Sequence, residues 1–281
     1  MSLVTRFLTA YIRSGLRGGT RLTNFLAARV PELQALELDT DRGKIVVDMR
    51  IASAHGIFAG IMADTGEHAV IERFVKAGDV VYDIGAHLGW YMAPLSRIVG
   101  ETGAVHAFEP NPELLPVLRK TAALYKNVRL YEVALAEEEG TVDLFIPEDA
   151  SMASLSNWTD GVGGGVHKLQ CRAVPLDAFA SEQDIPPPRF IKCDVEGAEF
   201  SVFSGARETL DREDAPIILF ELNKKAAQSF GKQTSDYLSL LASLEKPAYK
   251  FFEVLPDGIR ELEETEVDYK NVLAIPAARC E

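Results

Sequence analysis

The sequence predicts an α/β protein of the Rossmann-like type, with helices on both faces of a mostly parallel sheet. Between residues 80 and 133, short runs rich in β-branched residues alternate with stretches of helical periodicity. Strands in such a βαβαβ order pair in parallel, because each connection is a right-handed crossover. A length of 281 residues, with 47% hydrophobic and 25% charged residues, suits a folded domain with a full core.

We expect two parts in the chain, an N-terminal helical arm over residues 1–35 and a Rossmann-like domain over residues 36–281. Apolar residues at helical spacing predict a first helix over residues 3–12. A glycine-rich break at residues 15–19 interrupts it, and Thr20 is placed to cap a second helix. No internal repeat and no linker rich in proline or serine marks a further domain.

The elements of the larger domain follow from periodicity and from helix-stop residues. A strand at residues 44–49 and a helix at 67–76 come first. The parallel core then begins with strand 80–84, helix 91–99, strand 104–108, helix 111–125 (with Asn111 as N-cap and Pro112 at the first helical position) and strand 128–133. A strand at 141–146 and a loop over 147–170 follow, and then strand 190–194, helix 197–210, strand 217–221, helix 235–244 and strands 249–255 and 271–275.

The charge of the chain is strongly acidic and unevenly distributed. A net charge of −13 argues against a nucleic-acid substrate, because phosphate binding requires a basic surface. Residues 1–31 contain five arginines and no acid, so they carry +5 and the remainder carries −18. This basic arm predicts contact with a second copy of the chain in a homodimer or, as the alternative, weak contact with an anionic membrane surface.

Three cysteines without C-x-x-C spacing predict reduced thiols and neither a disulfide framework nor a zinc site. No apolar run is long enough to span a bilayer, and the first residues lack the pattern of a signal peptide. We therefore expect a cytoplasmic protein.

A glycine loop and a distant carboxylate predict a nucleoside-containing cofactor. The segment DIGAHLG, which runs from Asp83 to Gly89, lies where the first parallel strand turns into its helix. Gly85 permits a tight turn with close approach of the ligand, and Gly89 permits close packing of helix on strand. Glu109 ends the second strand, 24 residues beyond Gly85, where a carboxylate meets the two ribose hydroxyls of an adenosine-containing cofactor.

The spacing of the loop favours S-adenosylmethionine over NAD. Dinucleotide sites use G-x-G-x-x-G, because their backbone amides approach a pyrophosphate. Here the spacing is G-x-x-x-G and an acid, Asp83, precedes it. S-adenosylmethionine carries no phosphate but has an ammonium and a sulfonium, which suit a nearby carboxylate.

Together these segments resemble the FkbM family of methyltransferases over roughly residues 70–225. The matching segments are DIGAHLGW (83–90), FEPNP (108–112), VAL (133–135), ASLSNW (153–158), IKCDVEGAEF (191–200) and FELN (220–223). The resemblance implies a Rossmann-like class I methyltransferase fold with a seven-stranded sheet. It also implies S-adenosylmethionine as cofactor and methyl transfer to a hydroxyl of a sugar or secondary metabolite. One departure is His87, where the family usually has Asn, and imidazole there allows a pH-sensitive cofactor affinity.

The resemblance also implies roles for individual residues. The loop residues Asp83, Gly85, Ala86, His87 and Gly89 would shape the methionine end of the cofactor site. Glu109 and Pro110 would lie at the ribose, Val133 and Ala134 near the adenine, and Ser154 in the same pocket. Asp194 would face the methionine moiety and the transferable methyl, and Glu196 is the candidate general base. Helix capping by Glu196 is the alternative.

Oxygen ligands at two strand ends also allow a metal site. Asp194, Glu221 and Asn223 end neighbouring predicted strands and could hold Mg²⁺, which would lower the pKa of a substrate hydroxyl. The alternative is that these residues cap helices and hold the loop. Ser151, Ser154 and Trp158 are candidates for the pocket mouth.

Two other functions remain open at this point, an NAD(P)-dependent oxidoreductase and a non-catalytic nucleotide-binding module. The glycine spacing and the lack of a plausible Tyr-x-x-x-Lys pair disfavour the oxidoreductase. The non-catalytic binding module is disfavoured because every position that matches the cofactor site of the family carries a residue able to fill its role. The acceptor, a hydroxyl on a small molecule or a glycan, has no specific motif in the sequence.

Overall fold

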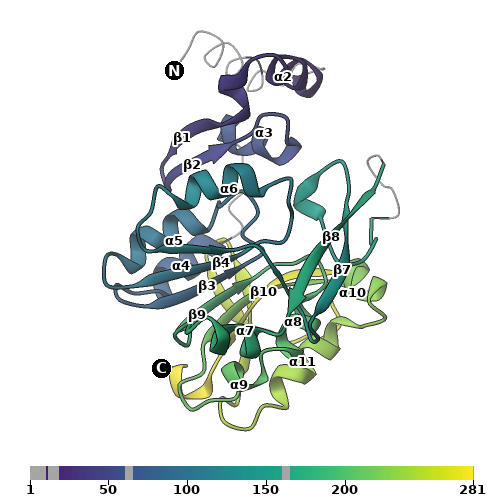
Figure 1. The fold of residues 1–281 in the computed structure, drawn as a ribbon. Coiled ribbons are helices and arrows are strands. Elements are labelled where there is room, and N and C mark those ends of the chain that lie inside the picture. Colours follow the sequence, from purple (N-terminus) through teal and green to yellow (C-terminus); the bar gives the residue numbers. More distant parts are fainter. Residues whose placement is uncertain (1–10, 12–18, 61–65, 160–164, 281) are drawn as a thin grey trace.

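An eight-stranded sheet forms the centre of the computed structural model, which describes residues 11, 19–60, 66–159 and 165–280 (Figure 1). Its strand order is β12-β11-β13-β10-β9-β3-β4-β5. The strands are β3 (Val80–Ile84), β4 (Ala104–Phe108), β5 (Val128–Tyr131), β9 (Phe190–Cys193), β10 (Ile217–Asn223), β11 (Lys250–Leu255), β12 (Gly258–Glu261) and β13 (Tyr269–Ile275).

The five strands from β5 to β10 pair in parallel, whereas β13 lies antiparallel between β10 and β11. The predicted fold class, a mostly parallel Rossmann-like sheet, is therefore confirmed. The predicted number of seven strands is wrong, because β12 pairs antiparallel with β11 as an eighth strand at the edge. This four-residue strand includes Arg260 and Glu261, and so lacks the apolar run that marks the inner strands.

Helices cover both faces of the sheet, as predicted. On one face, α4 (Glu67–Phe74), α5 (Met92–Val99) and α6 (Leu115–Ala122) share a core with Val81 of β3. On the other face, α7 (Leu176–Glu182), α8 (Glu199–Ser204), α9 (Arg207–Leu210) and α11 (Thr234–Ala242) share a core with Tyr82 and Ile84. Successive residues of β3 thus face opposite cores, as the two-residue period of a strand requires.

Two predicted helices differ in detail from the structure. The helix expected over residues 197–210 is divided into α8 and α9 at Gly205, where a Cβ would lie 2.1 Å from the Ala136 carbonyl oxygen. The helix expected from Asn111 begins at Leu115 instead. Asn111 caps the preceding turn, because its Oδ1 accepts a hydrogen bond from the Glu113 amide at 3.0 Å.

A smaller sheet, in the order β6-β8-β7, lies beside the carboxyl ends of the parallel strands (Figure 1). It consists of β6 (Ala134–Leu135), β7 (Gly140–Ile146) and β8 (His167–Val174). Residues 167–170 were expected in a loop, but they pair antiparallel with β7. The strand could not be predicted from apolar periodicity, because most of these side chains are polar and exposed. Pairing with β7 supplies the hydrogen-bond partners of its backbone N–H and C=O groups. The short 3₁₀ helix η2 (Ala150–Met152) follows β7.

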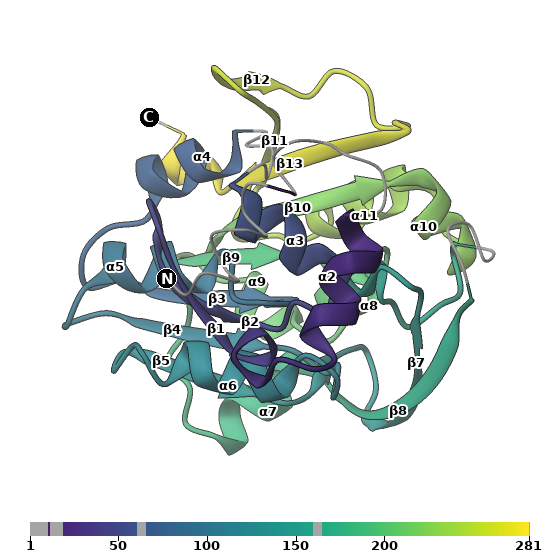
Figure 2. The same cartoon turned by 90° about the horizontal axis from the view of Figure 1, so that it is seen from above.

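The N-terminal elements pack against α5 and α6 and extend toward the loop that follows β3. They are α2 (Gly19–Ala27), η1 (Pro31–Gln34), the hairpin β1 (Leu36–Thr40) and β2 (Gly43–Val47), and α3 (Ala52–Ala59). A third core joins Val47 and Phe58 of this segment to Leu88 and Val117, and Figure 2 shows α2 and α3 from above. The helix predicted over residues 3–12 lies outside the described residues except at Tyr11, and Thr20 lies inside α2 instead of capping it.

Within the described part of the chain, none of the helices combines the length and the apolar character needed to cross a bilayer.

Candidate active site

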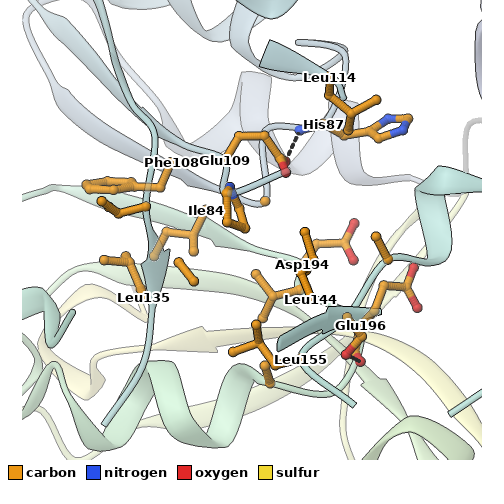
Figure 3. A pocket seen from close by; sticks show the side chains of 18 of the residues that line it. Ile84, His87, Phe108, Glu109, Leu114, Leu135, Leu144, Leu155, Asp194 and Glu196 are labelled. Atoms are coloured by element: carbon orange, nitrogen blue, oxygen red, sulfur yellow. Dashed lines mark hydrogen bonds between the residues drawn. The ribbon is translucent and has the colours of Figure 1, made fainter. Parts of the chain in front are cut away.

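A cavity opens at the carboxyl ends of β3, β4 and β9 (Figure 3). This is the edge of a parallel sheet at which α/β proteins bind ligands. Most of the residues predicted for the cofactor and the chemistry line it, namely Gly85, His87, Glu109, Pro110, Val133, Ala134, Ser154, Asp194 and Glu196. Ser151 lines it as well, whereas Asp83, Ala86 and Gly89 do not.

The two loop glycines act through the backbone. Gly85 has a φ of +79°, and a Cβ there would lie 1.9 Å from the Asp194 carbonyl oxygen. The close approach that Gly85 permits is therefore to the neighbouring loop of the protein. Gly89 has a φ of +85°, and a Cβ there would lie 2.8 Å from Met92 Cε, which agrees with the packing role expected for it. Ala86 is buried in the core beside α5.

Glu109 is held rigidly at the wall of the cavity. Its Oε2 accepts a hydrogen bond from the His87 amide at 2.8 Å (Figure 3), and its Oε1 accepts one from the Asn111 amide at 2.9 Å. Burial raises the pKa of Glu109 to about 7 despite these two donors. Each oxygen keeps a second lone pair, so the carboxylate can accept the two hydroxyl protons of a ribose.

His87 connects the glycine loop to the N-terminal segment. Its backbone is left-handed, with φ +51°, and its Nε2 lies 3.1 Å from Ser53 Oγ in α3. Burial, with the nearby Lys192 cation, lowers the pKa of His87 to about 4. The imidazole is thus neutral around pH 7, and the pH-sensitive cofactor affinity expected from its titration near neutrality is not supported.

Asp83 lies beneath the cavity instead of in its wall. The side chain is fully buried, and neither carboxylate oxygen has a hydrogen-bond partner among the described residues. Asp83 is the cross-strand neighbour of Lys192 in β9. Because Asp83 lies within β3, its side chain lies below the glycine loop that follows this strand. Burial raises the pKa of Asp83 to about 6, and the lysine opposes that rise.

Lys192, which is not among the predicted site residues, is the cation at the base of the site. Only 5% of this residue is exposed, and its Nζ lies 3.3 Å from both Asp194 Oδ2 and the Gly85 carbonyl oxygen. Its Nζ also lies 4.8 Å from the centre of the Tyr91 ring. Burial lowers the pKa of Lys192, but Asp194 and Asp83 outweigh it and raise the pKa to about 12. A lysine inside the apolar strand β9 was the available signal for this role.

Three carboxylates form an acidic cluster, of which Asp194 and Glu196 line one end of the cavity. Asp194, Glu196 and Glu221 each place an oxygen within 4.8 Å of the others. Burial and the neighbouring carboxylates raise the pKa values of Glu196 and Glu221. Helix capping, the alternative role for Glu196, is wrong, because the N-cap of α8 is Ala198 and Glu196 lines the cavity.

Asn223 has the capping role that was its alternative. Its Oδ1 accepts a hydrogen bond from the Ala226 amide at 3.4 Å and caps α10 (Lys224–Ser229). Its Nδ2 donates to Glu221 Oε1 at 3.2 Å. Glu196 therefore takes the place beside Asp194 and Glu221 that was expected for Asn223.

Apolar side chains form the opposite end of the cavity. Phe108 and Leu135 lie there, away from Asp194 and Glu196, with Glu109 between the two ends (Figure 3). This order fits S-adenosylmethionine, with adenine on apolar side chains, ribose at Glu109 and the cationic methionine end at the carboxylates. The unpartnered Asp83 carboxylate beneath the loop adds negative potential on that cationic side.

Comparison with known proteins decides the family. A profile of the methyltransferase FkbM domain matches residues 83–251, which include the glycine loop, Glu109 and the acidic cluster. The chain belongs to the FkbM methyltransferase family. The resemblance seen in the sequence is confirmed.

Two curated methyltransferases are similar to this chain. The 31-O-demethyl-FK506 methyltransferase FkbM of Streptomyces tacrolimicus is 26% identical over 162 residues, which cover 48% of this chain and 62% of the relative. The hexuronic acid methyltransferase AglP of Haloferax volcanii is 23% identical over 157 residues, which cover 54% of this chain and 62% of the relative. The chain thus spans less than two thirds of each relative's length.

Among solved structures, the methyltransferase FkbM of Methylobacillus flagellatus KT matches with a TM-score of 0.44 and 19% identity. The match covers 70% of this chain and 43% of that chain.

Proposed function

We propose that this FkbM family member transfers a methyl group from S-adenosylmethionine to a hydroxyl group of a sugar or secondary metabolite. The observation that carries the proposal is the Glu109 carboxylate. Two backbone amides fix it at the cavity wall, between apolar side chains on one side and acidic ones on the other. A fixed carboxylate in this setting selects a ligand that joins an apolar base, a ribose and a cationic end.

Each part of the cavity has a task in this reaction. Phe108 and Leu135 hold the adenine and exclude water, and Glu109 accepts hydrogen bonds from the ribose hydroxyls. The cofactor, when bound, supplies a methyl group on a positively charged sulfur. Glu196 accepts the proton of the acceptor hydroxyl, because it lies beside Asp194 at the cationic end and a raised pKa makes its carboxylate a stronger base. The positive charge of the bound cofactor at this end of the cavity would favour the ionised form of Glu196 before the methyl transfer.

The name of one relative supports oxygen as the methyl acceptor. One is a 31-O-demethyl-FK506 methyltransferase, and the other is a hexuronic acid methyltransferase. Both names fit an acceptor that is a secondary metabolite or a sugar.

A divalent cation such as Mg²⁺ is a further part of the proposal. Carboxylate oxygens are the ligands that Mg²⁺ prefers. Asp194, Glu196 and Glu221 supply three of them within 4.8 Å of one another, and their mutual repulsion would be relieved by a cation. The cation would hold the acceptor oxygen and lower the pKa of its hydroxyl.

Titration calorimetry with S-adenosylhomocysteine and with NAD tests the proposed cofactor. We expect saturable binding of S-adenosylhomocysteine and no comparable binding of NAD. Tighter binding of NAD would favour the oxidoreductase alternative. The non-catalytic alternative would stand if S-adenosylhomocysteine bound but radiolabelled methyl from S-adenosylmethionine reached no member of a panel of sugars and polyketides.

A further inference from the structure

The backbone at the proposed general base has a conformation that its residue type disfavours. Glu196 has a φ of +55°, in the left-handed region where a side chain crowds the backbone. Gly197, the next residue, has a φ of +97°, and a Cβ there would lie 2.8 Å from the Ala226 carbonyl carbon. A non-glycine residue keeps such a conformation only where the surrounding structure imposes it. The contacts of this loop therefore decide where the Glu196 carboxylate lies.

Two buried side chains fix the loop on either side of Glu196. Glu199 Oε1, in α8, accepts a hydrogen bond from the Val195 amide at 2.9 Å. The Tyr237 hydroxyl, in α11, donates one to the Gly197 carbonyl oxygen at 2.7 Å. Glu199 and Tyr237 are each only 1% exposed, so bulk water does not compete for these bonds. The residues before and after Glu196 are thus held by the helices beneath the loop.

The Ser154 hydroxyl reaches the peptide group of Glu196 itself. It donates a hydrogen bond to the Glu196 carbonyl oxygen at 2.7 Å, and Ser154 is buried. Backbone hydrogen bonds of 2.8 and 3.1 Å join Ser154 to Phe145 of β7 in both directions. The donor is therefore fixed by the smaller sheet, a different part of the chain from α8 and α11. Because a serine hydroxyl has a single proton, this bond uses the donor that Ser154 has.

The bond connects the wall of the cavity to its acidic end. Ser154 and Glu196 both line the cavity, and Glu196 lies at the same end as Asp194 (Figure 3). Glycine would remove the cost of the left-handed backbone at position 196, but it has no carboxylate. A glutamate held by a neighbouring hydroxyl keeps both the turn and the acid.

We propose that Ser154 is a positioning residue for Glu196. Its hydroxyl holds the Glu196 peptide group in the left-handed conformation, which keeps the carboxylate at the end of the cavity where the cationic part of the cofactor binds. The inference rests on the proposed function, since it takes Glu196 as the acid beside the methyl-bearing sulfur. It adds a residue that acts on the reaction through Glu196.

Two cofactor analogues of different charge test the inference without a methyl acceptor. S-Adenosylhomocysteine is neutral at sulfur, whereas sinefungin carries an ammonium group in place of the transferable methyl. A carboxylate held at this position should favour sinefungin, by about tenfold for a charged hydrogen bond. Titration calorimetry gives the ratio of the two affinities. EDTA in the buffer keeps divalent cations away from the acidic cluster.

Ser154→Ala removes the hydroxyl and nothing else. We expect the preference for sinefungin to fall about fivefold, as for the loss of one hydrogen bond, while the affinity for S-adenosylhomocysteine changes little. Retained binding of S-adenosylhomocysteine also shows that the variant is folded. Ser156→Ala is the matched control, because that hydroxyl donates to the Ser229 carbonyl oxygen at 3.1 Å, and it should keep the full preference.

A double-mutant cycle separates positioning from a general structural effect. Glu196→Gln alone should lower the preference for sinefungin. Adding Ser154→Ala to Glu196→Gln should lower it no further, because Ser154 acts through the carboxylate that is already gone. An unchanged preference in Ser154→Ala, or an equal fall in the Glu196→Gln background, would overturn the inference.

The unmodified protein distinguishes this inference from the proposed function. Absent binding of S-adenosylhomocysteine would overturn the proposed function. Intact binding of S-adenosylhomocysteine without any preference for sinefungin would overturn the positioning role and leave the proposed cofactor standing.

Discussion

Lys192 Nζ lies 3.3 Å from Asp194 Oδ2, in a strand whose other residues are apolar and buried. The same ammonium group lies 3.3 Å from the Gly85 carbonyl oxygen. One buried cation therefore links the glycine loop after β3 to the acidic loop after β9, and these two loops form the cationic end of the proposed cofactor site.

Replacing Lys192 by Met should lower the free energy of unfolding by about 2–3 kcal/mol, somewhat less than for a fully buried ion pair because Asp194 is partly exposed. The substitution leaves the buried Asp83 carboxylate without a nearby cation. Urea denaturation measures the change, with Lys120→Met on the exposed face of α6 as the control. Adding Asp83→Asn to Lys192→Met should recover part of the loss, because the uncompensated acid is then gone. Equal stability of Lys192→Met and the unmodified protein would contradict this role.

Glu109→Ala should weaken S-adenosylhomocysteine binding by about 1.5–3 kcal/mol, the contribution of hydrogen bonds to a charged group. Calorimetry gives the difference directly. Glu113→Ala is a suitable control, since that exposed carboxylate pairs with His167 at 3.0 Å and does not line the cavity. Similar losses in the two variants would show that Glu109 does not contact the ligand.

Cofactor affinity should rise with pH up to about 7 and then level off. In the free protein, burial raises the pKa of Glu109 to about 7. Ribose hydroxyls stabilise the ionised carboxylate, so binding lowers this pKa and releases a proton whenever Glu109 starts protonated. Below pH 7 the affinity should therefore change by up to about tenfold per pH unit.

Calorimetry in two buffers of different ionisation enthalpy measures the released proton. Glu109→Gln should reduce the slope of the pH profile to the part that Asp83 contributes, whose pKa burial raises to about 6. His87 contributes nothing in this range because its pKa lies at about 4. A profile that falls as pH rises from 6 to 7 would refute the assignment.

Removing divalent cations should reduce methyl transfer by at least about tenfold, with recovery on addition of Mg²⁺. The reason is the acidic cluster of Asp194, Glu196 and Glu221. Glu221→Gln should raise the Mg²⁺ concentration needed for half-maximal activity. Full activity after exhaustive EDTA treatment, on an accepted substrate, would rule out the metal.

Phe25→Glu on α2 should weaken a homodimer formed through the N-terminal arm. Phe25 is 53% exposed, and the Arg29 guanidinium lies 3.8 Å from the centre of its ring, which gives α2 an apolar and basic outer face. Light scattering should show a smaller species while S-adenosylhomocysteine binding stays intact. A protein that is monomeric at micromolar concentration and cosediments with anionic vesicles would favour the membrane alternative.

Patterns within a few neighbouring residues were enough to predict the parallel strands and the position of Glu109 in the wall of the proposed cofactor cavity. The β-branched run at Val80–Ile84 and the placement of Glu109 after the second strand needed only local sequence. The hairpin partner β12 and the first residues of β8 escaped prediction, because pairing with another strand, and not apolar periodicity, makes them strands.

The site residues that were misplaced depend on contacts between distant segments. Asp83 lies opposite Lys192 across two strands more than a hundred residues apart, so its burial is not visible in the loop motif. Asn223, expected as a metal ligand, caps α10 instead, and Glu196 joins Asp194 and Glu221. The choice between capping a helix and joining the carboxylates depends on where α8 and α10 begin.

The left-handed backbone at His87 and Glu196 has a consequence for heat tolerance. Both are non-glycine residues with φ near +50°, a conformation that costs about 1 kcal/mol or more at each position. Both also line the cavity, so glycine would relax the chain there but would delete the imidazole and the proposed base. Engineering that ranks substitutions by stability alone would select glycine at these two positions, and the gain in melting temperature would come with loss of the site.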